Sequence, residues 1–283
     1  MFASAVGIAR QFTWPVVLSR RYYDKSVESG MAAFTVVNEE GWILTAAHVF
    51  QAALVLPTHQ NEIAAYELVG QKRGKSGKRK AGGAKPNPKW IVDHSYWWGR
   101  DGVTVRNIVA AFELDLALGQ LTPFDPKWVG AYPRFKDPSS ALLPGTSLCR
   151  LGFPFHEFTA KYEKGKGFML PEGAIPAPLF PIEGIFTRNL IGPKTKDGKY
   201  EIKYIETSSP GLRGQSGGPI FDTDGVVWGI QSRTNHLALG FSPTVKKGRS
   251  KVEEHQFLSV GLGVHPEVIS AFLKDHGVTF EVV

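Results

Sequence analysis

The chain has 283 residues, of which 42% are hydrophobic and 21% charged, a composition typical of a soluble globular protein with a substantial core. It contains no run of about 18 apolar residues, so we do not expect a membrane-spanning helix. Its formal net charge of +7 comes from one segment, residues 71–89, in which every charged side chain is basic, and the remainder is close to neutral.

The predicted elements are mostly short strands, because 31 Gly and 19 Pro interrupt the sequence too often for long helices. In chain order we expect strands over residues 13–22, 31–38 and 43–46, and two more within 103–121. A second set is expected over residues 148–153, 184–190, 200–207, 219–222 and 226–232. Residues 266–275 predict a helix, with Pro in its first turn and apolar residues at Val268, Ile269, Phe272 and Leu273.

Three short motifs carry candidate catalytic side chains. His48 ends the tetrapeptide Thr-Ala-Ala-His directly after a predicted strand, and Asp115 begins Asp-Leu-Ala-Leu. Ser216 lies in the hexapeptide Gly-Gln-Ser-Gly-Gly-Pro, residues 214–219, where glycines let the backbone bend and expose the hydroxyl. A serine hydroxyl is a weak nucleophile until a base takes its proton, and a carboxylate can orient that base. The order His, Asp, Ser, with gaps of 67 and 101 positions, therefore predicts a Ser-His-Asp triad.

With these motifs in this order, the chain resembles a trypsin-like serine peptidase over roughly residues 34–272. The resemblance implies an all-β, chymotrypsin-like fold of two packed six-stranded antiparallel β-barrels with a C-terminal helix. It places His48 and Asp115 in a first barrel within residues 1–135, and Ser216 in a second within residues 136–283. The stretch from Phe34 to Thr45 is similar to the HtrA-like branch, and we expect a peptidase domain without a PDZ module.

The resemblance also implies a role for each group. His48 accepts the Ser216 proton and later returns it to the leaving amine, while Asp115 orients the imidazole. The backbone N–H groups of Gly214 and Ser216 form an oxyanion hole, in which one donor is worth ~3 kcal/mol of barrier. A peptide substrate pairs with the strand near Ser232, and the implied substrate-binding residues are Pro210, Gly211, Leu212, Arg213, Gln215, Gln231, Ser232, Arg233 and Thr234.

Three positions depart from the digestive members of the family. Gln215 stands where those enzymes have an Asp that pairs with a newly cut amino terminus, so we do not expect that activation. Pro210 stands where trypsin has the acid that binds Lys or Arg, so a pocket for basic residues is not expected. Thr234 replaces a common glycine and favours small or medium apolar substrate side chains. We expect a regulatory endopeptidase with few substrates.

The basic segment, residues 71–89, lies between His48 and Asp115 as an insertion in the first barrel. We expect a flexible, solvated loop, because nothing apolar in it can anchor a fold. Its charge also fits an electrostatic tether for nucleic acid, an acidic partner or an anionic membrane, through Lys72 to Lys89. The alternative function is therefore a catalytically silent or partner-activated scaffold that binds protein or nucleic acid through this segment.

The remaining reactive side chains predict no cofactor and no metal site. The other histidines lack the spacing of zinc ligands, and Asp93 and Asp101, rival partners for the histidine, lie outside the family motif. For the aromatic segment 94–98, ordinary packing is favoured over a place beside the substrate cleft. Cys149 is expected to be buried and, as the single cysteine, cannot form an internal disulfide. Since the amino terminus does not resemble an export signal, we expect a cytoplasmic protein.

Overall fold

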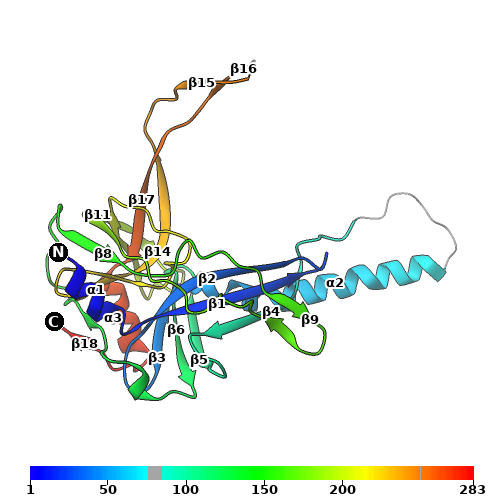
Figure 1. The fold of residues 1–283 in the computed structure, drawn as a ribbon, viewed down its shortest axis with the longest axis horizontal. Helices are drawn as coiled ribbons and strands as arrows, with labels where there is room; N and C mark the ends of the chain where they lie inside the picture. The colour runs from blue at the N-terminus through cyan, green and yellow to red at the C-terminus, as the bar shows by residue number, and fades with distance from the viewer. Residues whose placement is uncertain (76–84, 249) are drawn as a thin grey trace.

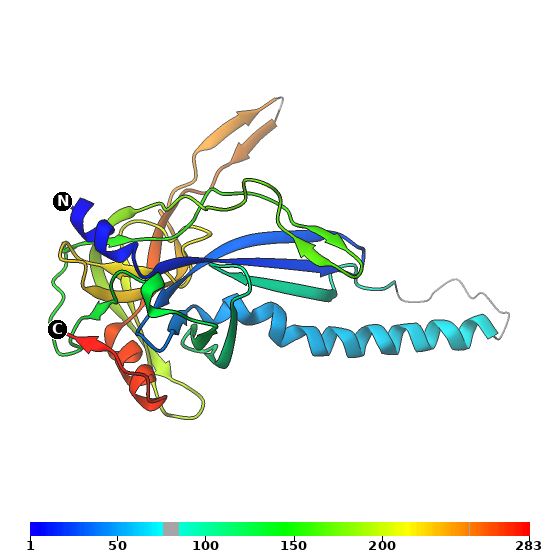
Figure 2. The same ribbon diagram turned by 60° about the horizontal axis from the view of Figure 1, so that its bottom comes forward.

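The fold was analysed in a computed structural model, which describes residues 1–75, 85–248 and 250–283. Two β-sheets form its body, one built from residues 13–122 and the other from residues 134–282 (Figure 1). Two projections leave this body, the helix α2 (Gln51–Lys75) and the hairpin of β15 (Thr244–Lys247) and β16 (Ser250–Glu253) (Figure 2). The predicted domain division after residue 135 stays a prediction.

The first sheet is antiparallel throughout, with the strand order β4-β1-β2-β3-β6-β5. Two of its four inner strands, β3 and β6, are short and mostly buried, as expected for strands covered on both faces. In their register Thr45 pairs with Ala117, which brings the end of β3 next to the start of β6. The strands are β1 (Thr13–Tyr22), β2 (Val27–Val36), β3 (Trp42–Thr45), β4 (Ile91–Trp98), β5 (Thr104–Ala111) and β6 (Leu116–Thr122).

The second sheet has eight strands among the described residues, in the order β13-β8-β11-β12-β17-β14-β7-β18, where six were expected. The two extra strands are short and pair in parallel, so the sequence pattern does not reveal them. A separate hairpin joins β9 (Lys161–Glu163) and β10 (Gly167–Met169). The strands of the sheet are β7 (Arg134–Phe135), β8 (Ser147–Arg150), β11 (Ile182–Lys194), β12 (Glu201–Thr207), β13 (Pro219–Phe221), β14 (Val227–Ala238), β17 (Phe257–Val264) and β18 (Glu281–Val282).

The helix α2 corrects the expectation that the chain contains no long helix, since it runs over 25 residues. Its first part packs on the sheet, where Val55 and Leu56 contact a cluster that includes Ile91 of β4. Farther along, Leu68 is 56% exposed, so no continuous apolar stripe marks the helix in the sequence. Residues 71–75 of the basic segment form its end, which corrects the loop predicted there, and residues 76–84 lie outside the described residues.

The other helices are short and cover the ends of the sheets. They are α1 (Ala3–Ala9), the 3₁₀ turns η1 (Ala47–Phe50) and η2 (Pro126–Trp128), and α3 (Pro266–Asp275). The bounds of α3 are those predicted, and the side chain of His265 caps it by accepting a hydrogen bond from the Glu267 N–H at 3.2 Å. None of the described helices has both the length and the apolarity that a bilayer crossing needs.

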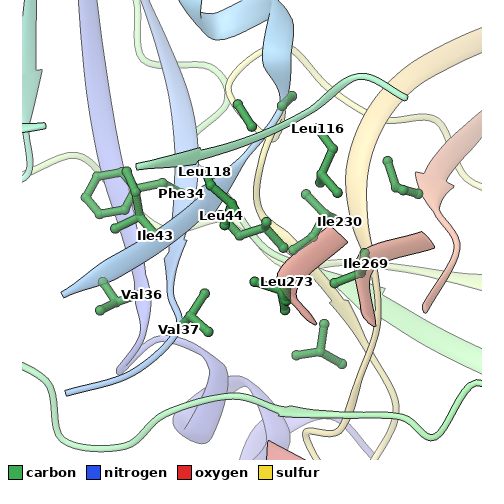
Figure 3. Close-up of a cluster of buried hydrophobic side chains, with 14 of the residues drawn as sticks. Phe34, Val36, Val37, Ile43, Leu44, Leu116, Leu118, Ile230, Ile269 and Leu273 are labelled. Atoms are coloured by element: carbon green, nitrogen blue, oxygen red, sulfur yellow. The ribbon is translucent and has the colours of Figure 1, made fainter. Parts of the chain in front are cut away.

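A single large cluster of buried side chains links the two sheets and α3. Ile43 and Leu118 come from the first sheet, Ile230 from the second, and Ile269 and Leu273 from α3 (Figure 3). All five are fully buried. The strands β3, β6 and β14 are therefore fixed relative to one another. His48 follows the end of β3, Asp115 precedes β6, and Ser216 precedes β13, which pairs with β14.

Candidate active site

His48 is held just beyond the end of a buried strand. Thr45, the last residue of β3, donates its hydroxyl hydrogen to the carbonyl oxygen of Ala33 at 2.8 Å. The chain then turns through η1, in which Ala47 and Val49 are buried. The side chain of His48 between them is 45% exposed. The imidazole thus reaches solvent from a rigid base.

Asp115 contacts His48 from the position directly before β6. Its Oδ1 accepts hydrogen bonds from Nδ1 and from the backbone N–H of His48, at 2.9 and 3.0 Å. Its Oδ2 accepts a hydrogen bond from the Ser232 hydroxyl at 2.5 Å. Because Nδ1 donates to a carboxylate, Nε2 of the neutral ring is left as a proton acceptor.

Two features show how strongly Asp115 is constrained. Its backbone φ of 54° lies in the left-handed region, which is uncommon for residues other than glycine and recurs at functional sites. Burial of the carboxyl raises the pKa of Asp115, but hydrogen bonds from His48 and Ser232 outweigh this effect and hold the pKa below its ordinary value. The carboxylate therefore remains charged beside the imidazole.

Ser216 lies in a loop whose shape depends on glycine. Gly214 and Gly217 have φ values of 98° and 83°, a region in which other residues are strained. A Cβ atom on Gly214 would also meet the carbonyl carbon of Phe153 at 2.6 Å. The loop can therefore take this path only with glycine at position 214.

Backbone hydrogen bonds tie this loop to both sheets. The Gly217 N–H donates to the Gln231 carbonyl of β14 at 2.8 Å. The carbonyl of Ser216 accepts a hydrogen bond from the Ala33 N–H of β2, also at 2.8 Å. Ala33 thus contacts both the strand that leads to His48 and the residue that carries the candidate nucleophile, a role that the sequence did not indicate.

An open cavity of about 1220 Å³ brings the separate motifs together. His48, Ser216 and Gly214 all contribute to its wall, which also contains Phe153, Phe155 and His156. Among the described residues, no hydrogen bond joins the His48 ring to the Ser216 hydroxyl. Such bonds are often long in the absence of substrate and tighten when it binds.

The expected substrate-binding residues do not all face this cavity. Leu212 and Arg213 are among its lining residues. Gln215 is fully buried instead, and its side chain bonds to the Leu212 N–H at 3.0 Å and the Phe180 carbonyl at 3.3 Å. The rest are not among its lining residues, namely Pro210, Gly211, Gln231, Ser232, Arg233 and Thr234.

The other candidate groups lie in structural settings. Asp101 accepts a hydrogen bond from the Trp97 indole at 2.7 Å, and no described contact joins Asp93 to His48. The aromatic segment 94–98 forms most of β4, where Tyr96 packs beside Trp98. Cys149 is buried, as predicted, and burial raises its pKa to about 11. The described residues include no cluster of metal-ligand side chains.

Arg150 is the most unusual residue near the site, and the sequence analysis did not select it. It lies fully buried in β8, inside the otherwise apolar run from Leu148 to Leu151. An arginine in an apolar strand is a detectable signal, because arginine is almost never fully buried without a partner.

A chymotrypsin-like fold with an imidazole, a buried carboxylate and a serine around one cavity is the architecture of a peptidase. A family model of the trypsin-like peptidase domain matches residues 32–230, and the chain belongs to this family, as the motifs predicted. No curated protein matches it by sequence.

Two solved structures are similar to the chain. One is the active form of the Rv3671c protease from M. tuberculosis, with 13% identity and a TM-score of 0.51 over 99% of this chain and 86% of that chain. The other is the HtrA-type protease AlgW with a tripeptide, with 15% identity and a TM-score of 0.49 over 99% of this chain and 65% of that chain. The first likeness supports the predicted chymotrypsin-like fold.

Proposed function

We propose that this protein is a serine endopeptidase with His48, Asp115 and Ser216 as its catalytic triad. The observation that carries the proposal is the 2.9 Å contact between Nδ1 of His48 and Oδ1 of Asp115, at a cavity that Ser216 also lines. This contact fixes the tautomer in which Nε2 can take a proton. Membership of the trypsin-like peptidase family supports the same assignment.

The reaction proceeds through an acyl-enzyme. Nε2 of His48 takes the Ser216 hydroxyl proton while the oxygen bonds to the substrate carbonyl carbon. The imidazolium, stabilised by the charge of Asp115, then gives this proton to the leaving amine as the peptide C–N bond breaks. A water molecule, deprotonated in the same way by His48, then bonds to the acyl carbon. His48 returns this proton to the Ser216 oxygen as the ester bond breaks and the acid product leaves.

The backbone N–H groups of Gly214 and Ser216 are the proposed oxyanion hole. Among the described hydrogen bonds neither N–H group is a donor, so both are free to bind a developing negative charge. The positive φ of Gly214 contributes to the loop shape in which both groups are available. One such donor contributes about 3 kcal/mol to the barrier reduction.

The proposed substrate is an extended peptide that pairs with β14. One edge of β14 pairs with β7 at Val227 and with β17 from Ile230 to Ala238, whereas its other edge pairs with β13 only as far as Ile230. The described structure thus leaves a free edge beside Ser232, onto which a peptide can add as a strand. We further propose a regulatory peptidase of few substrates in the cytoplasm, for which the support is a chain with one buried cysteine.

Labelling with a fluorophosphonate tests the proposal, because this probe reacts with an activated serine. We expect a stable adduct on Ser216 of the wild-type chain and none on Ser216→Ala. Ser208→Ala is the matched control, since Ser208 lies in a neighbouring loop and donates to no catalytic group. An adduct that persists in Ser216→Ala, or a wild-type chain that neither reacts nor cleaves a diverse peptide library, would overturn the assignment.

A further inference from the structure

Arg150 carries a buried positive charge that has no negative partner among the described residues. The residue is only 2% exposed. None of the ion pairs among the described residues includes it. Burial lowers the pKa of Arg150 to about 10, so the guanidinium is still charged at neutral pH. Isolating such a charge from water is costly, and proteins normally place a carboxylate beside it.

The hydrogen bonds of Arg150 are incomplete. Nη1 donates to the carbonyl oxygens of Ser209 and Pro210, at 2.7 and 2.8 Å, and Nη2 donates to the Thr207 hydroxyl. Nε is buried and has no hydrogen-bond partner in the part of the chain that the structure describes. All these acceptors are neutral, so the charge is solvated by dipoles alone. The guanidinium, with five N–H donors, retains capacity for an anion.

The guanidinium lies directly behind the proposed substrate site. A Cβ atom on Gly261 of β17 would fall 2.6 Å from its Cζ, so glycine at this position makes room for it. Gly261 pairs with Thr234 of β14, and the Thr234 hydroxyl donates to the carbonyl of Gly211. Arg150 therefore occupies the space between the segment 207–211 and the strand pair at Thr234.

One of these flanking segments leads into the cavity. The segment 207–211 continues into Leu212 and Gly214, which line the cavity beside Ser216. On the other flank, Oε1 of Gln231 is a second buried polar atom without a partner, and a Cβ atom on Gly211 would meet the Cδ of Gln231 at 2.7 Å. The segment 209–212 is therefore flanked by two buried polar atoms without a partner among the described residues, Nε of Arg150 and Oε1 of Gln231, which do not suit an apolar side chain.

We propose that Arg150 determines the specificity of the peptidase by binding the carboxylate of an aspartate or glutamate at the residue whose carbonyl group Ser216 attacks. A substrate carboxylate would supply the missing charge partner and accept the free N–H hydrogen. The sequence favoured small or medium apolar side chains, an expectation based on Thr234 alone. This inference rests on the proposed function, so its test must distinguish a failure of the proposed specificity from a failure of the proposed peptidase activity.

The test uses peptides that differ only in the residue before the cleaved bond, which is Glu, Asp, Gln, Ala, Leu or Lys. For the wild-type protein we expect kcat/KM for the Glu or Asp peptide to exceed that for the Gln peptide by about 100-fold. This is the size of the loss when one partner of a buried, desolvated charge pair is removed. Arg150→Met, which keeps most of the volume, should abolish this difference, and Arg150→Lys should retain part of it. The control Arg106→Met removes an exposed arginine of β5 and should leave the preference intact.

Fluorophosphonate labelling of Ser216 in each variant reports the nucleophile independently of the substrate side chain. A labelled wild-type protein that prefers Leu or Ala, or an Arg150→Met variant that still prefers Glu, would overturn the specificity inference while leaving the proposed function standing. A wild-type protein that neither labels nor cleaves would overturn the proposed function instead. Binding of the Glu and Gln peptides to Ser216→Ala, measured by calorimetry, requires neither turnover nor a folded Arg150 variant. Equal affinity for the two peptides there would also overturn the inference.

Discussion

The two sheets hold their parts of the candidate site in different ways. In the first sheet, His48 and Asp115 are fixed by hydrogen bonds to the carboxylate of Asp115. The three donor groups are the backbone N–H and Nδ1 of His48 and the hydroxyl of Ser232. In the second sheet, Ser216 is fixed by the backbone, through glycines at 214 and 217 that no other residue can replace without strain. The first sheet thus sets the charge of Asp115 and the tautomer of His48, and the second sheet sets the shape of the loop that carries Ser216.

The contacts between the sheets make each side depend on the other. Ser232, from the second sheet, donates to Asp115 of the first, while Ala33, from the first, donates to the carbonyl of Ser216 in the second. The second sheet therefore donates a side-chain hydrogen bond to the first, and the first donates a backbone hydrogen bond to the second. Changes to the carboxylate should alter the chemistry with little change in shape, whereas changes to the glycines should alter the shape of the loop and, through it, the chemistry.

The largest effect is expected from Asp115→Asn. The amide would donate to Nδ1, so the ring would have to carry its proton on Nε2 and could no longer accept the proton of Ser216. We expect kcat to fall by about 10⁴-fold, the scale found when this exchange is made in a Ser-His-Asp triad. Steady-state kinetics on a cleaved peptide would measure it.

The control for this exchange is Asp101→Asn, because Asp101 accepts from Trp97 and is not part of the site. Its kinetics should match those of the wild type. A fall of less than tenfold for Asp115→Asn would show that the carboxylate does not set the tautomer of His48.

An intermediate effect is expected from Gly214→Ala. The new methyl group would collide with the Phe153 carbonyl and displace an oxyanion donor, so we expect kcat to fall by about 100-fold. Gly145→Ala is a matched control, since its φ of 94° is similar but no atom lies within 4 Å of the added Cβ. Both variants should lose about 1 kcal/mol of stability from the backbone strain. Equal activity in both would show that the shape of the loop at 214 is not critical.

The sequence predicted the parts of the molecule that repeat a local pattern. The strands around His48 and Asp115 alternate or run apolar, and α3 has a regular apolar face, so their positions were correct within a few residues. The helix α2 was missed because its outer part has no buried face and its sequence contains Pro57. The pairing of β7 with β18 was missed because two-residue strands leave no pattern.

The candidate site likewise combines residues that a local motif reveals with residues that only contacts between distant segments bring into place. Motif order indicated His48, Asp115 and Ser216 as candidates, but the position of Arg150 behind Gly211 depends on contacts between β8 and β17 that no local pattern encodes. Likewise, nothing in the sequence marks Ala33 as the donor to Ser216, since any residue other than proline could supply that N–H group.

The smallest effect is expected from Ser232→Ala, which removes one donor from Asp115. At neutral pH the variant should lose about 2 kcal/mol of unfolding free energy, the usual loss for a hydrogen bond to a buried charge. Its kcat should fall by about tenfold, because His48 still holds the carboxylate. The loss should depend on pH, since the pKa of Asp115 is lowered in the folded protein.

A lowered carboxyl pKa stabilises the fold above the pKa of the unfolded chain, and this stabilisation disappears as the pH falls through the folded pKa. The stability difference between wild type and Ser232→Ala should therefore shrink in acid, as measured by urea unfolding at neutral pH and at about pH 3. Ser19→Ala is the control, because Ser19 is also buried but bonds to the Ser29 hydroxyl, so its effect should not change with pH. A Ser232→Ala difference that is constant across this range would mean that Ser232 stabilises the junction of the sheets by packing and not through the charge of Asp115.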